Sequence, residues 1–217
     1  FIRPSPSSGS LGGVAHHSRE SIILCEAAGF DTIIVETVGV GQSEIEVKEM
    51  TDFFLLLMLA GAGDELQGIK RGIMEMADLI LITKADGKNK RNSNIAAQAY
   101  RNALMLFPMN ENLWEPKVVV TSSEDKVGFE KVNSLIEEFL NSSQQNGHFQ
   151  KNRKEQDLYW LDESLQRLLM GSLYDNEDLE TLIQQKKEEL SSGEISSYQA
   201  AEEIFNAYKR IVLNDRI

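Results

Sequence analysis

Residues 33–42, with the sequence IIVETVGVGQ, decide the fold that the chain predicts. The stretch begins with three β-branched apolar residues, reaches the carboxylate of Glu36, and then carries glycines at Gly39 and Gly41. A short apolar run that ends in such a turn is typical of a strand buried on both faces of a parallel sheet. Ligands of open α/β sheets bind beyond the carboxyl ends of the strands. Glu36 is therefore a candidate for holding a divalent cation, and Gly39 for approaching a phosphate, while an ordinary strand end with a glycine turn is the alternative.

Apolar runs alternate with helical patterns over the first two-thirds of the chain. The runs predict strands at 32–35, 53–59, 79–82 and 117–120. The helix between the last two strands is expected to bury one apolar face, made of Ile95, Ala99, Ala103 and Leu106. Strict alternation with short connections predicts an α/β fold with a mainly parallel sheet.

The composition changes near residue 143. A polar linker at 142–147, with the sequence SSQQNG, is followed by three helical patterns and no strand pattern. We therefore expect one domain at 1–143 and a helical extension at 144–217. Amphipathic helices in such a place can pack back on the domain, bind a partner or pair with a second copy. The first of them carries a stripe of leucines, Leu158, Leu161, Leu165 and Leu168.

Bulk properties narrow the function classes. The 217 residues are 41% hydrophobic, which is enough for the core of one medium domain. A net charge of −12 without a basic patch argues against binding of nucleic acid. No apolar segment is long enough to span a membrane. The single cysteine, Cys25, cannot form an internal disulfide, which favours a reducing cytoplasm.

Two further strand ends carry polar residues that suit a nucleotide base. Lys84 and Asp86 follow the third predicted strand, and residues 121–123 (TSS) follow the fourth. A carboxylate at such a corner can accept hydrogen bonds from the ring N–H and the exocyclic amine of guanine, whereas adenine offers neither donor in that arrangement. The aliphatic stem of Lys84 can lie along the base. The backbone amides and hydroxyls of 121–123 can reach the base oxygen.

The sequence resembles the P-loop GTPases associated with methylmalonyl-CoA mutase, a family also described as arginine and ornithine transport-system kinases. The resemblance covers nearly the whole chain and is most specific in 1–9 (FIRPSPSSG), 35–44 (VETVGVGQSE) and 63–70 (GDELQGIK). It implies a P-loop NTPase domain followed by a C-terminal helical extension. It also implies GTP or GDP and Mg²⁺ as ligands, methylmalonyl-CoA mutase as partner, and a homodimer formed through the C-terminal helices.

The resemblance also implies roles for individual residues. Glu36 would lie near the magnesium ion and Gly39 would face the γ-phosphate. Lys84 and Asp86 would read guanine, with Ser122 beside the base. For Gln42 two roles stay open, because it can orient a water for hydrolysis or cap the helix that follows.

The glycine-rich segment at 61–70 would signal the nucleotide state to the mutase. Its polar contacts would be Asp64, Gln67 and Lys70. A glycine-rich loop that leads into a helix can move, and an aspartate at that end is favoured by the helix dipole. A plain helix cap is the alternative role of Asp64.

Two features depart from the family pattern. Thr83 stands where the family usually has asparagine, so the brace between this loop and the phosphate loop is expected to be weaker. The sequence also contains no Gly-x-x-x-x-Gly-Lys-Ser/Thr, the loop that holds the β- and γ-phosphates. In the family that loop lies upstream of the point where this chain begins. We therefore expect the C-terminal part of a longer GTPase, which by itself binds nucleotide poorly and hydrolyses little.

The predicted function of the complete protein is that of a GTPase that acts as a chaperone of adenosylcobalamin-dependent methylmalonyl-CoA mutase, in cofactor loading and protection. Two alternatives remain. One is an ATP-dependent kinase of a periplasmic amino-acid transport system, against which Asp86 argues. The other is a non-catalytic interaction module in which the helical extension is the working part.

Overall fold

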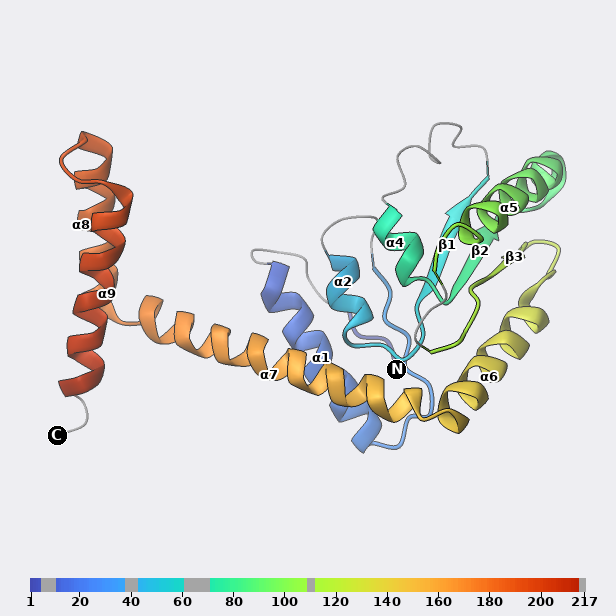
Figure 1. The fold of residues 1–217 in the computed structure, drawn as a ribbon, viewed down its shortest axis with the longest axis horizontal. Coiled ribbons are helices and arrows are strands. Elements are labelled where there is room, and N and C mark those ends of the chain that lie inside the picture. Colours follow the sequence, from blue (N-terminus) through green and yellow to red (C-terminus); the bar gives the residue numbers. More distant parts are fainter. Residues whose placement is uncertain (5–10, 38–42, 61–70, 109–111, 215–217) are drawn as a thin grey trace. The chain divides into compact units, whose positions relative to one another are not determined.

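The computed structural model describes residues 1–4, 11–37, 43–60, 71–108 and 112–214, and it forms two compact units, Phe1–Asp157 and Leu158–Ile217. Helix α7 (His148–Tyr174) begins in the first unit and continues in the second, which also holds α8 (Glu177–Ser192) and α9 (Ser197–Asn214). The other elements lie in the first unit (Figure 1). In chain order they are α1 (Leu11–Ala27), α2 (Ser43–Lys48), β1 (Leu55–Leu59), α4 (Arg71–Met76), β2 (Leu79–Thr83), the 3-10 helix η1 (Gly87–Asn89), α5 (Lys90–Leu104), β3 (Lys117–Val120) and α6 (Phe129–Gln145).

The three strands form one parallel sheet in the order β1-β2-β3. In the register, Leu79 of β2 lies between Leu55 of β1 and Lys117 of β3. Three of the four strands that the apolar runs predict are therefore present. The predicted α/β fold with a parallel sheet and a helical C-terminal part is confirmed.

The strand predicted at 32–35 is wrong, because residues 32–37 belong to no strand. A strand needs a partner for its backbone N–H and C=O groups. Within the part of the chain that the structure describes, nothing pairs with the edge of β1 that faces away from β2. The side chain of Ile34 is 87% exposed, so this apolar run also lacks the burial that the prediction assumed.

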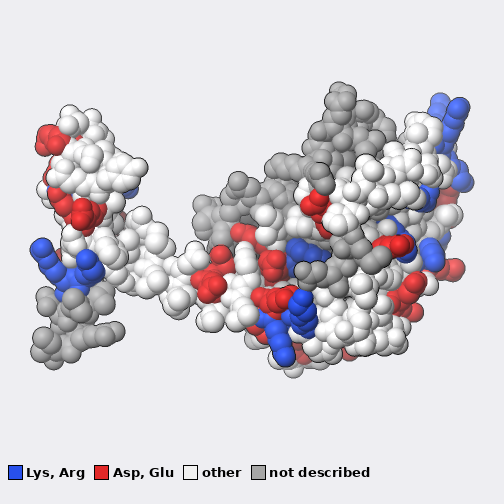
Figure 2. Space-filling model, viewed as in Figure 1, with Lys and Arg blue, Asp and Glu red and all other residues white. Residues whose placement is uncertain are grey.

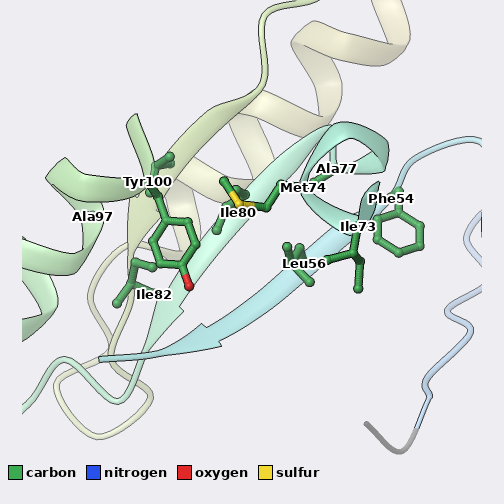
Figure 3. Packing of buried hydrophobic residues seen from close by; sticks show 10 residues of the cluster. Phe54, Leu56, Ile73, Met74, Ala77, Ile80, Ile82, Ala97 and Tyr100 are labelled. Carbon is green, nitrogen blue, oxygen red and sulfur yellow. The ribbon is translucent and has the colours of Figure 1, made fainter. Parts of the chain in front are cut away.

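Buried side chains cover both faces of the sheet. Ile80 and Ile82 of β2 point to one face, where they pack with Ile73 of α4 and Tyr100 of α5 (Figure 3). The alternate residues of the same strand point to the other face, which α6 covers; this second cluster contains Leu79, Leu81, Trp114, Val132, Leu135 and Phe139. Because both faces of β2 are buried, its sequence is a continuous apolar run rather than an alternating one.

The buried face of α5 is only partly the predicted one, because Ala103 packs against the core while Ile95 does not. Ile95 is 60% exposed, while Ser93, Ala97 and Tyr100 are buried. The small side chains of Ser93 and Ala97 leave room for close approach to the sheet, and the hydroxyl of Ser93 donates to the carbonyl oxygen of Asn89 at 3.0 Å. The apolar pattern therefore placed the buried face too far toward Ile95, because two of the buried positions carry the small side chains of Ser93 and Ala97.

The amino-terminal part of α7 is held on the first unit by polar contacts. Arg153 donates from Nε to Asp52 Oδ1 at 2.7 Å and from Nη1 to Glu26 Oε1 at 2.6 Å. These hydrogen bonds, first the one to Asp52, raise the pKa of Arg153 above its usual value. Gln156 adds a hydrogen bond to the carbonyl oxygen of Thr51 at 2.9 Å. This end of α7 therefore ties α1 to the turn that precedes β1.

The three predicted C-terminal helices are present as α7, α8 and α9. Asn176 caps α8 by accepting a hydrogen bond from the Leu179 amide. Lys186 joins α8 to α9, because its Nζ lies 2.7 Å from both Glu189 and Glu203. None of the helices in the described ranges is long and apolar enough to cross a membrane.

Candidate functional site

The chain segments that follow β2 and β3 remain hydrogen-bonded beyond the ends of the strands. The Thr121 amide donates to the carbonyl oxygen of Ile82 at 2.8 Å, and the Ala85 amide donates to the carbonyl oxygen of Thr121 at 3.1 Å. The two tips therefore form one corner at the carboxyl edge of the sheet. This edge is where open α/β sheets bind their ligands.

Asp86 and Ser122 meet in this corner. The Ser122 hydroxyl donates to Asp86 Oδ2 at 3.1 Å and accepts a hydrogen bond from the Asp125 amide at 3.0 Å. Ser122 is 2% exposed, whereas Asp86 is half-buried, so the serine holds the carboxylate from the protein side. No ion pair between described residues involves Asp86. Its carboxylate is therefore not neutralised by a described cation and can accept hydrogen bonds from a ligand.

Lys84 has an unusual backbone. Its φ is +54°, in the left-handed region, where a residue with a side chain is disfavoured by roughly 1–2 kcal/mol. The Lys84 carbonyl oxygen accepts a hydrogen bond from Nδ2 of Asn89 at 2.9 Å. The Lys84 side chain is exposed, so its stem is accessible to a planar ligand.

Thr83, the residue that departs from the family pattern, is turned toward the sheet. Its hydroxyl donates to the carbonyl oxygen of Met58 in β1 at 3.1 Å. The threonine thus braces β2 against β1 at their carboxyl ends. None of the described contacts of Thr83 joins this loop to a phosphate loop.

Sequence patterns alone missed two residues of the corner. Asn89 precedes α5 in a polar run, which gave no sign that its side chain reaches back to Lys84. Gly128 has φ +92°, and a Cβ added to it would lie 2.5 Å from the carbonyl oxygen of Val120, so only glycine fits there. A lone glycine just before a helical pattern is the signal that could have pointed to this close approach.

Glu36 lies in the segment 32–37, which belongs to no helix or strand, and no described contact joins it to the corner. It is exposed, and its carboxylate is a hard oxygen donor of the kind that Mg²⁺ prefers. Among the described residues no group of three or more His, Cys, Asp or Glu could hold a metal ion. A single exposed carboxylate such as that of Glu36 can supply one Mg²⁺ ligand of a nucleotide site, where phosphate oxygens and water supply the others.

The remaining predicted residues lie outside the described ranges. They are Gly39, Gln42, Asp64, Gln67 and Lys70.

A cavity of about 840 Å³ lies elsewhere in the first unit. It is lined by residues of α5, α6 and β3 and of the segment between α5 and β3, including Arg101, Lys117 and Leu135. Neither Asp86 nor Ser122 of the corner lines it. On the face drawn in Figure 2, acidic and basic side chains of this unit are interspersed.

The parallel sheet between helical layers, followed by a helical C-terminal part, defines an α/β protein, and its match to a solved structure supports a fold of the P-loop NTPase type. A solved structure described as "Crystal structure of LAO/AO transport system kinase" matches with a TM-score of 0.72 and 36% identity, over 96% of this chain and 66% of that one. The model of the family described as "Methylmalonyl Co-A mutase-associated GTPase MeaB" matches residues 1–178. The chain belongs to this MeaB family of GTPases, as the sequence blocks indicated.

Curated relatives support the same family. GTPase ArgK of Escherichia coli (strain K12) is 45% identical over 185 residues, which cover 85% of this chain and 56% of that protein. The mitochondrial methylmalonic aciduria type A homolog of Mus musculus is 38% identical over 209 residues, covering 96% of this chain and 50% of that protein. The chain thus spans about half the length of these relatives.

Proposed function

We propose that the complete protein is a guanine-nucleotide-binding GTPase that acts as a chaperone of adenosylcobalamin-dependent methylmalonyl-CoA mutase. The observation that carries the nucleotide part is the corner in which the Ser122 hydroxyl holds the Asp86 carboxylate at 3.1 Å, at the carboxyl edge of the sheet. The family and its members named as GTPases support the same chemistry.

In this proposal the residues of the chain bind and orient the nucleotide. Asp86 accepts from the ring N–H and the exocyclic amine of guanine, and the stem of Lys84 lies along the base. Glu36 helps to hold Mg²⁺, which when bound neutralises charge on the phosphate oxygens. Gly39 faces the γ-phosphate and Gln42 orients the attacking water. Transfer to water then needs positioning and charge stabilisation rather than a protein nucleophile.

The mutase part rests on the family description and on the names of relatives. We assign the signalling of the nucleotide state to segment 61–70, with Asp64, Gln67 and Lys70 as its contacts to the mutase.

We also propose a cytoplasmic location, because a chain with the single cysteine Cys25 forms no internal disulfide.

The second candidate function is an ATP-using kinase of an amino-acid transport system, which the similarity to the solved transport system kinase favours. The two candidate functions differ in the base that the protein must bind, which is guanine for the GTPase and adenine for the kinase. Adenine carries no N–H donor at the ring position where guanine does, so the Asp86 carboxylate would face an acceptor.

The nucleotide preference of the complete gene product tests the proposal. We expect GDP to bind at least about 100-fold more tightly than ADP, since two hydrogen bonds to a carboxylate depend on the base. We also expect GTP turnover to respond to added methylmalonyl-CoA mutase. Equal affinity for ADP, or turnover of ATP at the same rate, would contradict the assignment and favour the kinase.

We propose further that the C-terminal helices form a homodimer. Four leucines on α7 are each more than half exposed, at a spacing that places them on one side of the helix. Sedimentation of the chain with and without residues 150–217 is expected to show a dimer and a monomer, respectively. A monomer in both cases would contradict the proposal. The leucines are Leu158 (63% exposed), Leu161 (61%), Leu165 (53%) and Leu168 (62%).

A further inference from the structure

The peptide unit between Lys84 and Ala85 is held at both ends. Its carbonyl oxygen, on Lys84, accepts from the Asn89 side chain at 2.9 Å, and its N–H, on Ala85, donates to the Thr121 carbonyl oxygen at 3.1 Å. The bond to Thr121 joins two main-chain groups, so it does not depend on the side chain at position 89. The bond from Asn89 is the one that a side chain supplies.

This peptide unit needs support because Lys84 has a φ of +54°. Residues other than glycine keep such a conformation only where the surroundings hold it. Relaxation of Lys84 to a negative φ, by rotation about its own N–Cα bond, would swing its carbonyl group away from the Asn89 side chain. The same change of φ would also turn the Cα–Cβ bond of Lys84, and with it the start of the side chain, away from its present direction.

Asn89 also touches the second base-reading residue. Its backbone N–H donates to the carbonyl oxygen of Asp86 at 2.9 Å. It stands at the N-cap of α5, where an asparagine side chain ordinarily accepts a hydrogen bond from the first turn of the helix. Here the side chain makes no cap hydrogen bond and reaches back to Lys84 instead. The side chain is thus directed to the corner rather than to the helix.

We propose that Asn89 is a positioning residue for guanine recognition, which holds Lys84 in the conformation that lays its stem along the base. The inference rests on the proposed function, because it assumes that Lys84 and Asp86 face a guanine. It adds to that function a residue that acts through Lys84 without touching the nucleotide itself.

The test compares Asn89→Ala with Asn94→Ala in the complete gene product. Asn94 is a matched control, because its Nδ2 also donates to a backbone carbonyl, that of Lys90 at 2.8 Å, on the exposed side of α5. We expect Asn89→Ala to lower GDP affinity about fivefold to tenfold, mainly through faster dissociation, with a smaller loss of ADP affinity because Asp86 does not hold adenine against the Lys84 stem. Asn94→Ala should stay within about twofold of the parent for both nucleotides.

Two further variants sharpen the result. Asn89→Asp keeps the size of the side chain but removes the N–H donor, so it should repeat the loss seen with alanine. When Asn89→Ala is added to Lys84→Gly, GDP affinity should fall by less than about a further twofold. Glycine adopts a positive φ without support, so the Asn89 side chain has nothing left to hold there. Denaturant unfolding of each variant shows whether it is folded, and Asn89→Asp stands in if Asn89→Ala is not.

Three outcomes would overturn the inference: GDP affinity of Asn89→Ala within about twofold of the parent, equal losses for GDP and ADP, or equal losses in the Asn89 and Asn94 variants. Asp86→Ala in the same series separates this inference from the proposed function. If Asp86→Ala keeps the preference for GDP, the proposed function fails and the inference with it. If Asp86→Ala loses the preference while Asn89→Ala binds GDP within about twofold of the parent, only the positioning role of Asn89 is overturned.

Discussion

Replacing Asp86 by alanine in the complete gene product is expected to lower GDP affinity by about 10²- to 10⁴-fold, because two hydrogen bonds to a charged acceptor are lost together. ADP affinity should change little, since adenine uses neither bond. The GDP-over-ADP preference should therefore collapse. Competition binding against a fluorescent guanine nucleotide measures both affinities with the same protein sample.

Asp125→Ala is the matched control for this experiment. Asp125 is a carboxylate of the same corner, but its side chain lies 3.8 Å from Lys90 on the exposed surface and its contribution to the corner is a backbone N–H. Removing that carboxylate leaves the hydrogen bond to Ser122 in place. We expect its GDP affinity to remain within about threefold of the parent, because exposed ion pairs contribute little. Equal losses in the two variants would point to a general effect of charge.

Asp86→Asn is expected to change which base is preferred, whereas Asp86→Ala only weakens binding of GDP. Asparagine replaces one acceptor oxygen by an N–H₂ donor. Xanthine carries a carbonyl where guanine carries its exocyclic amine, so the new donor suits xanthine. Xanthosine diphosphate should then bind this variant more tightly than GDP does. If guanine remains preferred, the carboxylate does not read the base.

The polar corner could be predicted because each part directly follows a short apolar run. Asp86 and Ser122 stand a few residues beyond strands that the sequence placed nearly correctly, at 79–82 and 117–120. Parallel neighbouring strands bring their carboxyl ends to one edge, so topology alone draws the two tips together. What the sequence could not show is the bond between them, in which the Ser122 hydroxyl turns toward Asp86.

The misplaced features depend on partners that a local pattern does not contain. The run at 32–35 has the composition of a strand, but pairing needs a neighbour, and none of the described residues supplies one. The buried side of α5 depends on how closely the helix approaches the sheet, which favours Ser93 and Ala97 over Ile95. The role of Asn89 depends on a left-handed Lys84, which no propensity predicts.

The largest effect on stability is expected at Asp78, in the turn before β2. Asp78 is only 1% exposed. Its Oδ2 accepts a hydrogen bond from the Phe54 amide at 2.8 Å and lies 3.0 Å from Lys48 Nζ. Its carbonyl oxygen also accepts from Trp114 Nε1 at 2.9 Å. The aspartate therefore joins α2, the residue before β1 and the segment before β3. Asp78→Ala leaves the Phe54 amide and the Lys48 ammonium without this acceptor.

We expect Asp78→Ala to reduce the free energy of unfolding by about 3–5 kcal/mol, the range for breaking a buried ion pair. Asp78→Asn should cost less, because its amide oxygen still accepts from Phe54. Lys90→Ala removes an exposed pair and serves as the control, with an expected cost below about 1 kcal/mol. Urea unfolding followed by tryptophan fluorescence measures all three, since Trp114 is buried.

A double-mutant cycle then separates the ion pair from the other contacts of Asp78. If Lys48 is stabilised mainly by Asp78, Lys48→Met should cost less in the Asp78→Ala background than in the parent, by about 1–3 kcal/mol. The ammonium left without its acceptor is then removed, so the second substitution relieves part of the first. Additive costs would show that the destabilisation comes from the Phe54 amide and from lost packing. A loss for Asp78→Ala no greater than that of Lys90→Ala would contradict the central place of Asp78 in the turn.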